Sequence, residues 1–362
     1  MKKLGIIALA LMLILALSAC AKEQTTGTPA DGTFEIALIT DVGTIDDKSF
    51  NQGAWEGVVA YAQEANKTHK YYKPSEKSDD AYLTSIDLAV KAGAKIIVCP
   101  GFLFEVPIFN AQDKYPDTKF IILDGYPHSG DWNPVVKDNT LSIFYAEQEA
   151  GFLAGYAAVK DGYKNLGFMG GMAVPAVVRF GYGYIQGAEV AAKELGLADG
   201  SVKVKYTYVG NFDATPENMA KAAAWYNEGT EIIFACGGAV GNSVMKAAET
   251  AKTKVIGVDV DQYAESETVI TSSMKNLTKS VYDALKLYFD GKFPGGDIQT
   301  LDATVGGVQL PMANSKFEKF SQADYDALYG QIVNKEFEIL GDQDVAGPKE
   351  IETQKVVVEE IN

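Results

Sequence analysis

Short continuous apolar runs recur along this chain, and each is followed by a turn and then by a helical pattern. Such runs, about four to eight residues long and bounded by turn residues, are typical of strands covered on both faces of a sheet. The runs are FEIALIT (34–40), KIIVC (95–99), KFIILD (119–124), NLGFMG (165–170), VKYTYV (204–209), EIIFAC (231–236) and KVIGVD (254–259). Strands that alternate with helices predict right-handed crossovers, and therefore an α/β fold with doubly wound parallel sheets.

The helices between these runs have recognisable starts. Ser49 and Gln52 have the spacing of a capping box before a helix whose apolar positions follow the 3.6-residue period. Thr215 followed by Pro216 places a cap and a first-turn proline before another helix. Ser321 predicts a third start of this kind.

Length and composition predict two lobes joined by a hinge. The chain has 362 residues, of which 47% are hydrophobic, and this is more than one core usually serves. We place lobe one at residues 34–140 plus about 275–311, and lobe two at residues 141–274 plus about 312–362. The end of the last segment is expected to be only partly ordered.

The N-terminal residues have the pattern of a bacterial lipoprotein signal. Two lysines precede an apolar stretch over residues 4–17, and the run Leu-Ser-Ala-Cys ends it at Cys20. The stretch is shorter than the roughly 20 apolar residues that cross a bilayer, which favours a secretory signal peptide over residues 1–19. Cys20 would then be lipidated, and residues 20–33 would form a tether to the extracytoplasmic face of the cell membrane. A plain signal peptide or a residual anchor helix are the alternatives.

Charge and cysteine content exclude several classes of protein. The net charge of −16 would be repelled by phosphates, so we expect no nucleic-acid partner. Cys99 and Cys236 end two apolar runs without a CxxC motif, and we interpret both as small buried hydrophobic residues. His69 and His128 have no partner at ligand spacing, so we expect no metal site and no cofactor.

Acidic and small residues follow many of the predicted strands. These positions are Thr40-Asp41, Pro100-Gly101, Asp124-Gly125, Gly170-Gly171, Gly237-Gly238 and Asp259. Ligands of open parallel sheets bind outside the carboxyl ends of the strands. Glycines are ordinary turn residues, but their recurrence beside carboxylates predicts a binding cleft where two such edges face each other.

Five motifs in order resemble the basic membrane protein family of lipoproteins, the PnrA-like nucleoside-binding components of ABC importers. They are DVGTIDDKSFNQ (41–52), RFGYGYIQG (179–187), FACGGAVG (234–241), VIGVDVDQ (255–262) and SSMKN (272–276). The resemblance covers nearly the whole mature chain. It implies a type I periplasmic-binding-protein fold whose two lobes close on a purine nucleoside, with ABC permease subunits as partners.

The resemblance also implies roles for individual residues. Phe50 and Phe180 would sandwich the base, although each could instead be a core residue. Apart from the resemblance, Arg179 is the one arginine of the chain, and an arginine beside a cleft is expected to brace the loop. Asp259 would accept hydrogen bonds from the ribose hydroxyls and Lys275 would contact the sugar. The base edge would be read by Asp41, Asn51 and Asp124, and the turn at Gly237 and Gly238 would let backbone approach the sugar, whereas Cys236 is not expected to contact the ligand.

These expectations describe a monomeric binding protein that is not an enzyme. A receptor of the same fold for a sugar, a pyrimidine nucleoside or a signalling molecule is the first alternative, and two facing phenylalanines favour a planar base. An exported nucleoside hydrolase is a second alternative. It would need a positioned water and a base or metal, and the sequence has no GxSxG elbow, Walker loop or histidine constellation.

Overall fold

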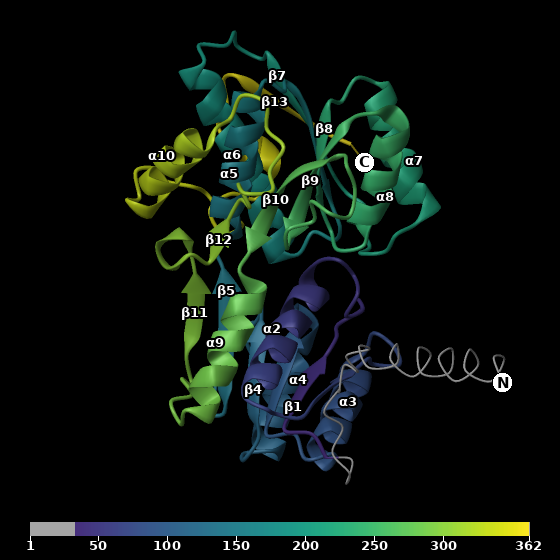
Figure 1. Ribbon diagram of the computed structural model, residues 1–362, viewed down its shortest axis with the longest axis vertical. Helices are drawn as coiled ribbons and strands as arrows, with labels where there is room; N and C mark the ends of the chain where they lie inside the picture. The colour runs from purple at the N-terminus through teal and green to yellow at the C-terminus, as the bar shows by residue number, and fades with distance from the viewer. Residues whose placement is uncertain (1–32, 362) are drawn as a thin grey trace, which may run out of the picture.

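The computed structural model describes residues 33–361. The predicted signal peptide, Cys20 and nearly all of the tether therefore lie outside the described residues. Two α/β lobes are stacked along the long axis of the molecule (Figure 1). None of the helices in the described part has both the length and the hydropathy required to cross a bilayer.

Lobe one is built on a parallel sheet of six described strands in the order β11-β5-β4-β3-β1-β2. The strands are β1 (Ile36–Ile39), β2 (His69–Tyr72), β3 (Ile96–Pro100), β4 (Lys119–Leu123), β5 (Thr140–Tyr145) and β11 (Ile298–Leu301). The helices are α2 (Phe50–Glu64), α3 (Asp79–Lys91), the short 3₁₀ turn η1 (Phe102–Phe104), α4 (Glu105–Lys114) and α9 (Leu277–Phe289).

Both faces of this sheet are covered, as the continuous apolar runs predicted. Successive side chains of a strand point to opposite faces. Ile36 and Leu38 of β1 share a core cluster with residues of α2 and α9, whereas Ala37 and Ile39 share a second cluster with residues of α3 and α4. The sheet is therefore fixed between two helical layers, and its carboxyl edge faces lobe two (Figure 1).

Lobe two repeats this design with seven described strands in the order β12-β10-β9-β8-β6-β7-β13. The strands are β6 (Asn165–Gly170), β7 (Val202–Tyr208), β8 (Ile232–Cys236), β9 (Lys254–Asp259), β10 (Val269–Lys275), β12 (Val308–Gln309) and β13 (Val356–Glu360). The helices are α5 (Glu147–Asp161), α6 (Pro175–Glu194), α7 (Pro216–Asn227), α8 (Val240–Ala251) and α10 (Gln322–Val333), with 3₁₀ turns η2 (Ala303–Val305) and η3 (Pro348–Glu350). Within the described pairings of this sheet, β12 is antiparallel to its neighbour β10.

The lobe boundaries differ from the predicted ones at two places. Residues 141–145 were expected in lobe two, but β5 pairs with β4 and β11 in the sheet of lobe one. The run at residues 301–311 was expected to return to lobe one, but β12 pairs with β10 in lobe two. The chain thus passes between the lobes after β5, after β10 and after β11, and a strand that ends at a crossing carries no sequence mark of the lobe to which it belongs.

The C-terminal segment is ordered to residue 361, contrary to expectation. Strand β13 extends the sheet of lobe two beside β7. The buried carboxylate of Glu189 in α6 accepts backbone hydrogen bonds from Gln354, Lys355 and Val356 at 2.8–2.9 Å. This polar anchor, together with the buried side chain of Val356, holds the strand on lobe two.

Two of the three predicted helix starts are confirmed. The Thr215 side chain accepts a hydrogen bond from the backbone N–H of Asn218 at 3.1 Å. Ser321 and Asp324 form a complete capping box at the start of α10. The third start, at Ser49, is built differently and belongs to the site described below.

Candidate functional site

A cavity of about 410 Å³ lies between the two lobes. Its walls come from the carboxyl ends of strands in both sheets and from the start of α6, where the predicted cleft was expected. All eight residues that the sequence singled out line it: Asp41, Phe50, Asn51, Asp124, Phe180, Gly237, Asp259 and Lys275. The structure therefore brings them together, and their contacts with a ligand stay predictions.

The loop between β1 and α2 supplies one polar wall. Asp41 Oδ1 accepts hydrogen bonds from the Gly43 N–H at 2.8 Å and from Asn51 Nδ2 at 2.9 Å. Burial raises the pKa of Asp41 to about 6, although these hydrogen bonds oppose the shift. Asn51 Nδ2 also donates to Asp47 Oδ2 at 2.9 Å. Asn51 thus holds Asp41 in place, and its expected contact with a base edge remains untested.

Helix α2 is capped by Asp47, and the predicted capping box at Ser49 is wrong. The Asp47 carboxylate accepts hydrogen bonds from the backbone N–H groups of Ser49, Asn51 and Gln52 at 2.9–3.1 Å. The Ser49 side chain makes no cap hydrogen bond. It instead donates to Asp259 Oδ2 in lobe two at 2.5 Å. Because Asp47 satisfies the helix end, the Ser49 hydroxyl is free to cross the cleft.

Lys275 occupies the centre of the site at the end of β10. Its ammonium nitrogen lies 4.7 Å from the ring centre of Phe50, 5.6 Å from that of Phe180 and 5.3 Å from that of Tyr145. It also forms an ion pair with Asp124 of lobe one. Both predicted rings therefore face one cation at the cavity. At these distances the ring quadrupole attracts the ammonium group.

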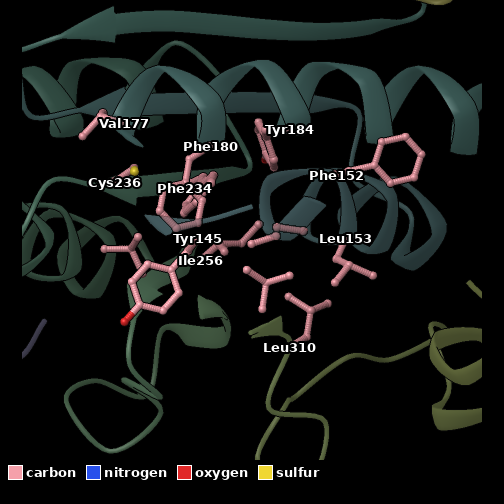
Figure 2. Packing of buried hydrophobic residues seen from close by; sticks show 14 of the residues in the cluster. Tyr145, Phe152, Leu153, Val177, Phe180, Tyr184, Phe234, Cys236, Ile256 and Leu310 are labelled. Carbon is pink, nitrogen blue, oxygen red and sulfur yellow. The ribbon is translucent and has the colours of Figure 1, made fainter. Parts of the chain in front are cut away.

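Phe180 serves the core and the cavity at once. Its side chain is 1% exposed and meets the ring of Phe234 edge to face at 5.8 Å. Figure 2 places Phe180 below its helix and beside Phe234, with Cys236 close by. Phe50 is only partly buried. Phe180 is thus a core residue that also lines the cavity, and its stacking on a base stays a prediction.

Asp124 carries an acceptor without a partner. Its Oδ1 atom is buried and has no hydrogen-bond partner among the described residues. Burial raises its pKa against the pull of the Lys275 ammonium. The residue has a φ of +56°, a left-handed conformation that aspartate tolerates at moderate cost. Strained residues of this kind tend to occur at functional sites.

Asp259 has the same unusual backbone in the opposite lobe, with a φ of +67°. Burial raises its pKa, and the Lys275 ammonium and the Ser49 hydroxyl oppose the shift. The neighbouring strand β8 ends at Cys236 and is followed by Gly237 and Gly238, and all three residues line the cavity. Cys236 lines the cavity although no ligand contact was expected of it, and that expectation stays a prediction.

Two residues behind the cavity, one buried and one partly buried, were missed by the sequence analysis or given only a general role by it. Glu147, in the first turn of α5, is 0% exposed and lies 3.0 Å from the Lys275 ammonium. Arg179 Nε donates to Glu147 Oε2 at 2.6 Å. An acidic residue in a first helical turn is too common to signal a site. The rarity of arginine in the chain was a signal for Arg179, whose bracing role the structure now specifies.

The cavity is acidic. Among its described lining residues are two lysines, Lys73 and Lys275, and six aspartates, which are Asp41, Asp46, Asp47, Asp124, Asp213 and Asp259. Carboxylates accept hydrogen bonds and disfavour nearby anions. Within residues 33–361, no group of three acidic, His or Cys side chains is arranged to hold a metal ion. The chemistry offered is the binding of a flat, donor-rich, uncharged or cationic ligand.

A family model called Bmp, described as an ABC transporter substrate-binding protein that is PnrA-like, matches residues 34–343. The chain is 31% identical to the ABC transporter nucleoside-binding protein BmpA of Lactococcus lactis subsp. cremoris, over 92% of this chain and 99% of that protein. It is 29% identical to an uncharacterized lipoprotein of Pyrococcus abyssi, over 85% of this chain and 77% of that one.

A solved structure resembles most of the described fold. An ABC transporter solute-binding protein from Aeropyrum pernix K1 superposes with a TM-score of 0.75 at 23% identity, covering 87% of this chain and 95% of that one. At this identity the likeness speaks for the fold alone. That fold is the type I periplasmic-binding-protein fold, as the resemblance implied.

Proposed function

The chain belongs to the Bmp family of PnrA-like ABC transporter substrate-binding proteins, and from this premise we propose that it binds a purine nucleoside between its lobes. It then delivers the nucleoside to the ABC permease subunits of an importer. The observation that carries the proposal is the position of Phe50 and Phe180 on one cavity, with Lys275 near both rings. The volume of about 410 Å³ lies within the usual range for small-molecule pockets.

The base would stack between the two phenylalanine rings. Offset stacking of flat π-systems adds about 0.5–1.5 kcal/mol per pair beyond burial. Asp41 and Asp124 would accept hydrogen bonds from ring N–H or amino groups at the base edge. The unpartnered Oδ1 of Asp124 supports this role, because a buried acceptor is costly until a donor reaches it.

The sugar would be read from lobe two. Asp259 offers an acceptor to ribose hydroxyls, and Lys275 offers a donor. The glycine turn at Gly237 would bring backbone close to the sugar. Six lining aspartates would repel a phosphate, which favours a nucleoside over a nucleotide.

The protein would work as a monomer on the extracytoplasmic face of the cell membrane, held there by lipid on Cys20. The Leu-Ser-Ala-Cys sequence supports this part of the proposal, as does the description of the Pyrococcus abyssi relative as a lipoprotein. Mass spectrometry of the protein from its native membrane should find a diacylglyceryl group on Cys20.

Calorimetry on the ligand-stripped soluble domain tests the ligand class. We expect guanosine, inosine or adenosine to bind at least about tenfold more tightly than cytidine, and ribose alone to bind weakly. Tighter binding of cytidine or ribose would overturn the purine assignment. Prolonged incubation with inosine should release no free hypoxanthine, and its release would instead indicate a hydrolase.

A further inference from the structure

A line of alternating charges runs from the cavity to the C-terminal segment. Asp124 pairs with Lys275, whose ammonium lies 3.0 Å from Glu147. Glu147 in turn pairs with Arg179 at 2.6 Å, and Arg179 Nη1 pairs with Asp342 at 3.1 Å. We call these five residues the charge ladder.

The ladder joins elements that are far apart in sequence. Asp124 follows β4 of lobe one, Lys275 ends β10, and Glu147 begins α5 just after the chain crosses between the lobes. Arg179 lies in α6, and Asp342 lies in the segment between α10 and η3. Asp124 and Lys275 line the cavity, whereas the other three are not among its described lining residues.

The outer part of the ladder is held rigidly. Helices α5 and α6 approach so closely that a Cβ on Gly183 would lie 2.0 Å from the carbonyl oxygen of Gln148. The segment that carries Asp342 is fixed by Gln186, which exchanges two hydrogen bonds with the backbone of Leu340, each 2.9 Å long. Arg179 therefore meets Glu147 in a defined geometry rather than as a mobile surface side chain.

The inner part of the ladder depends on a balance between buried positive and negative charges. Lys275 faces two carboxylates, and Glu147 faces two cations. Burial would raise the pKa of Glu147, but Arg179 and Lys275 together hold it below its usual range. Without Arg179, Lys275 would be the nearest cation left to neutralise buried Glu147, and its ammonium would be drawn toward α5 and away from Asp124.

We propose that Arg179 is a positioning residue for ligand binding, which fixes the Lys275 ammonium in the cavity through Glu147, with Asp342 as its outer support. The proposal rests on the proposed function of the cavity. It differs from a purely stabilising ion pair, because it requires the effect of Arg179 on affinity to pass through Lys275.

A double-mutant cycle separates these possibilities. The variants are R179Q, K275M and the pair, and the readout is the Kd for inosine by calorimetry. We expect R179Q to weaken binding about tenfold, the size of one charge-assisted hydrogen bond. In the K275M background the same change should alter the Kd less than about twofold.

The matched control is K335Q. Lys335 pairs at 2.9 Å with Glu149, a buried carboxylate two residues beyond Glu147 in the same helix. Its loss should lower the thermal midpoint while leaving the Kd for inosine unchanged. The milder variant D342N should weaken inosine binding about two- to fivefold, and it serves if R179Q does not fold.

Two results would overturn the proposal. One is a Kd that R179Q leaves within twofold of wild type while the thermal midpoint falls, as for K335Q. The other is an equal loss of affinity in both backgrounds. If the wild-type protein binds no inosine, the proposed function fails first. The positioning role then fails with it, and the cycle read in the unfolding constant tests only whether Arg179 and Lys275 are coupled through Glu147, with additivity refuting that link as well.

Discussion

At the scale of single residues, several side chains of the site do not make the local hydrogen bonds that their positions suggest, because neighbouring side chains make them. Ser49 is a helix-start residue that does not cap, because Asp47 caps for it. The Asn51 side-chain amide donates hydrogen bonds to Asp41 and Asp47. The carboxylates of Asp41 and Asp124 in lobe one and of Asp259 in lobe two line the cavity, and Asp124 Oδ1 is the one of these that the structure leaves without a hydrogen-bond partner among the described residues.

The two phenylalanines should respond differently to truncation. F50A should weaken purine nucleoside binding by about 1–3 kcal/mol with a small loss of stability, since Phe50 is only partly buried. F180A should weaken binding and also destabilise the fold by about 3–5 kcal/mol, because its ring is 1% exposed and packs on Phe234. Calorimetry and urea unfolding measure the two effects. Equal stability losses in both variants would contradict this difference in packing.

Asp41 should make affinity depend on pH. Burial raises its pKa to about 6, and an ionised carboxylate is needed to accept from a base N–H. Binding should therefore weaken as pH falls through 6, about tenfold between pH 7 and pH 5. In D41N that part of the pH dependence should vanish, while any part from Asp124 stays. A pH profile identical to that of wild type would remove Asp41 from the base edge.

The same group affects stability with the opposite sign. The folded protein holds the Asp41 proton more tightly than the unfolded chain, where the pKa has its ordinary value of 3.8. The stabilising contribution is thus fully present below pH 3.8 and is lost as pH rises through 6. The unfolding free energies of wild type and D41N should be measured from pH 4 to pH 7. They should converge at the acidic end, where Asp41 is protonated and as neutral as asparagine.

Sequence patterns predicted which residues form the site better than they predicted the hydrogen bonds that these residues make. The eight residues named from the sequence all line one cavity, because they lie at strand ends or in the first turns of helices at the facing carboxyl edges of the two sheets. Ser49 was misread because a capping box is a local pattern, whereas its hydroxyl bonds a residue 210 positions away. Glu147 was missed because its partners, Lys275 and Arg179, come from two other elements.

At the scale of elements, the sequence predicted strands that are apolar on both faces and missed the others. Strand β2, with the sequence HKYY, lies at the sheet edge with its residues exposed or partly exposed. Strand β10 is buried but polar, since Thr271, Ser272 and Ser273 are each at most 1% exposed. Neither has the continuous apolar run or the strict alternation that periodicity detects.

The contact between α5 and α6 should not tolerate a methyl group. In G183A the new Cβ would meet the carbonyl oxygen of Gln148 at 2.0 Å, so the helices must separate. We expect a loss of at least about 1–3 kcal/mol in the free energy of unfolding, measured in urea. The matched control is G330A in α10, where nothing lies within 4 Å of the added atom. There the better helix propensity of alanine should stabilise by about 0.5–1 kcal/mol.

At the scale of the whole molecule, one loop of lobe one meets one strand end of lobe two. Ser49 bonds Asp259, and Gln262 Nε2 donates to the carbonyl oxygen of Lys48 at 2.6 Å. Lys48 also lies 3.6 Å from Glu265. With the pair of Lys275 and Asp124, these contacts hold the lobes together around the cavity. Hinged closure of two lobes is the usual motion of such receptors.

Loss of the Ser49 hydroxyl should therefore loosen the closed arrangement. S49A removes a buried hydrogen bond to a carboxylate, an interaction of about 1.5–3 kcal/mol, and leaves Asp259 Oδ2 without that donor. Because the bond joins the lobes only when they are together, the loss should appear in the dissociation rate of a nucleoside, about tenfold faster by stopped flow. The association rate should change little, since the open form does not contain the bond.

The control for this change is S85A, since Ser85 is also a buried serine of lobe one. Its hydroxyl donates to the carbonyl oxygen of Ala81 within α3, so its removal leaves the contacts between the lobes intact. S85A should leave both rate constants near those of wild type. If S49A slowed association and left dissociation unchanged, the hydrogen bond to Asp259 would already form before the lobes close on the ligand. Closure would then depend on the Lys275 and Gln262 contacts instead.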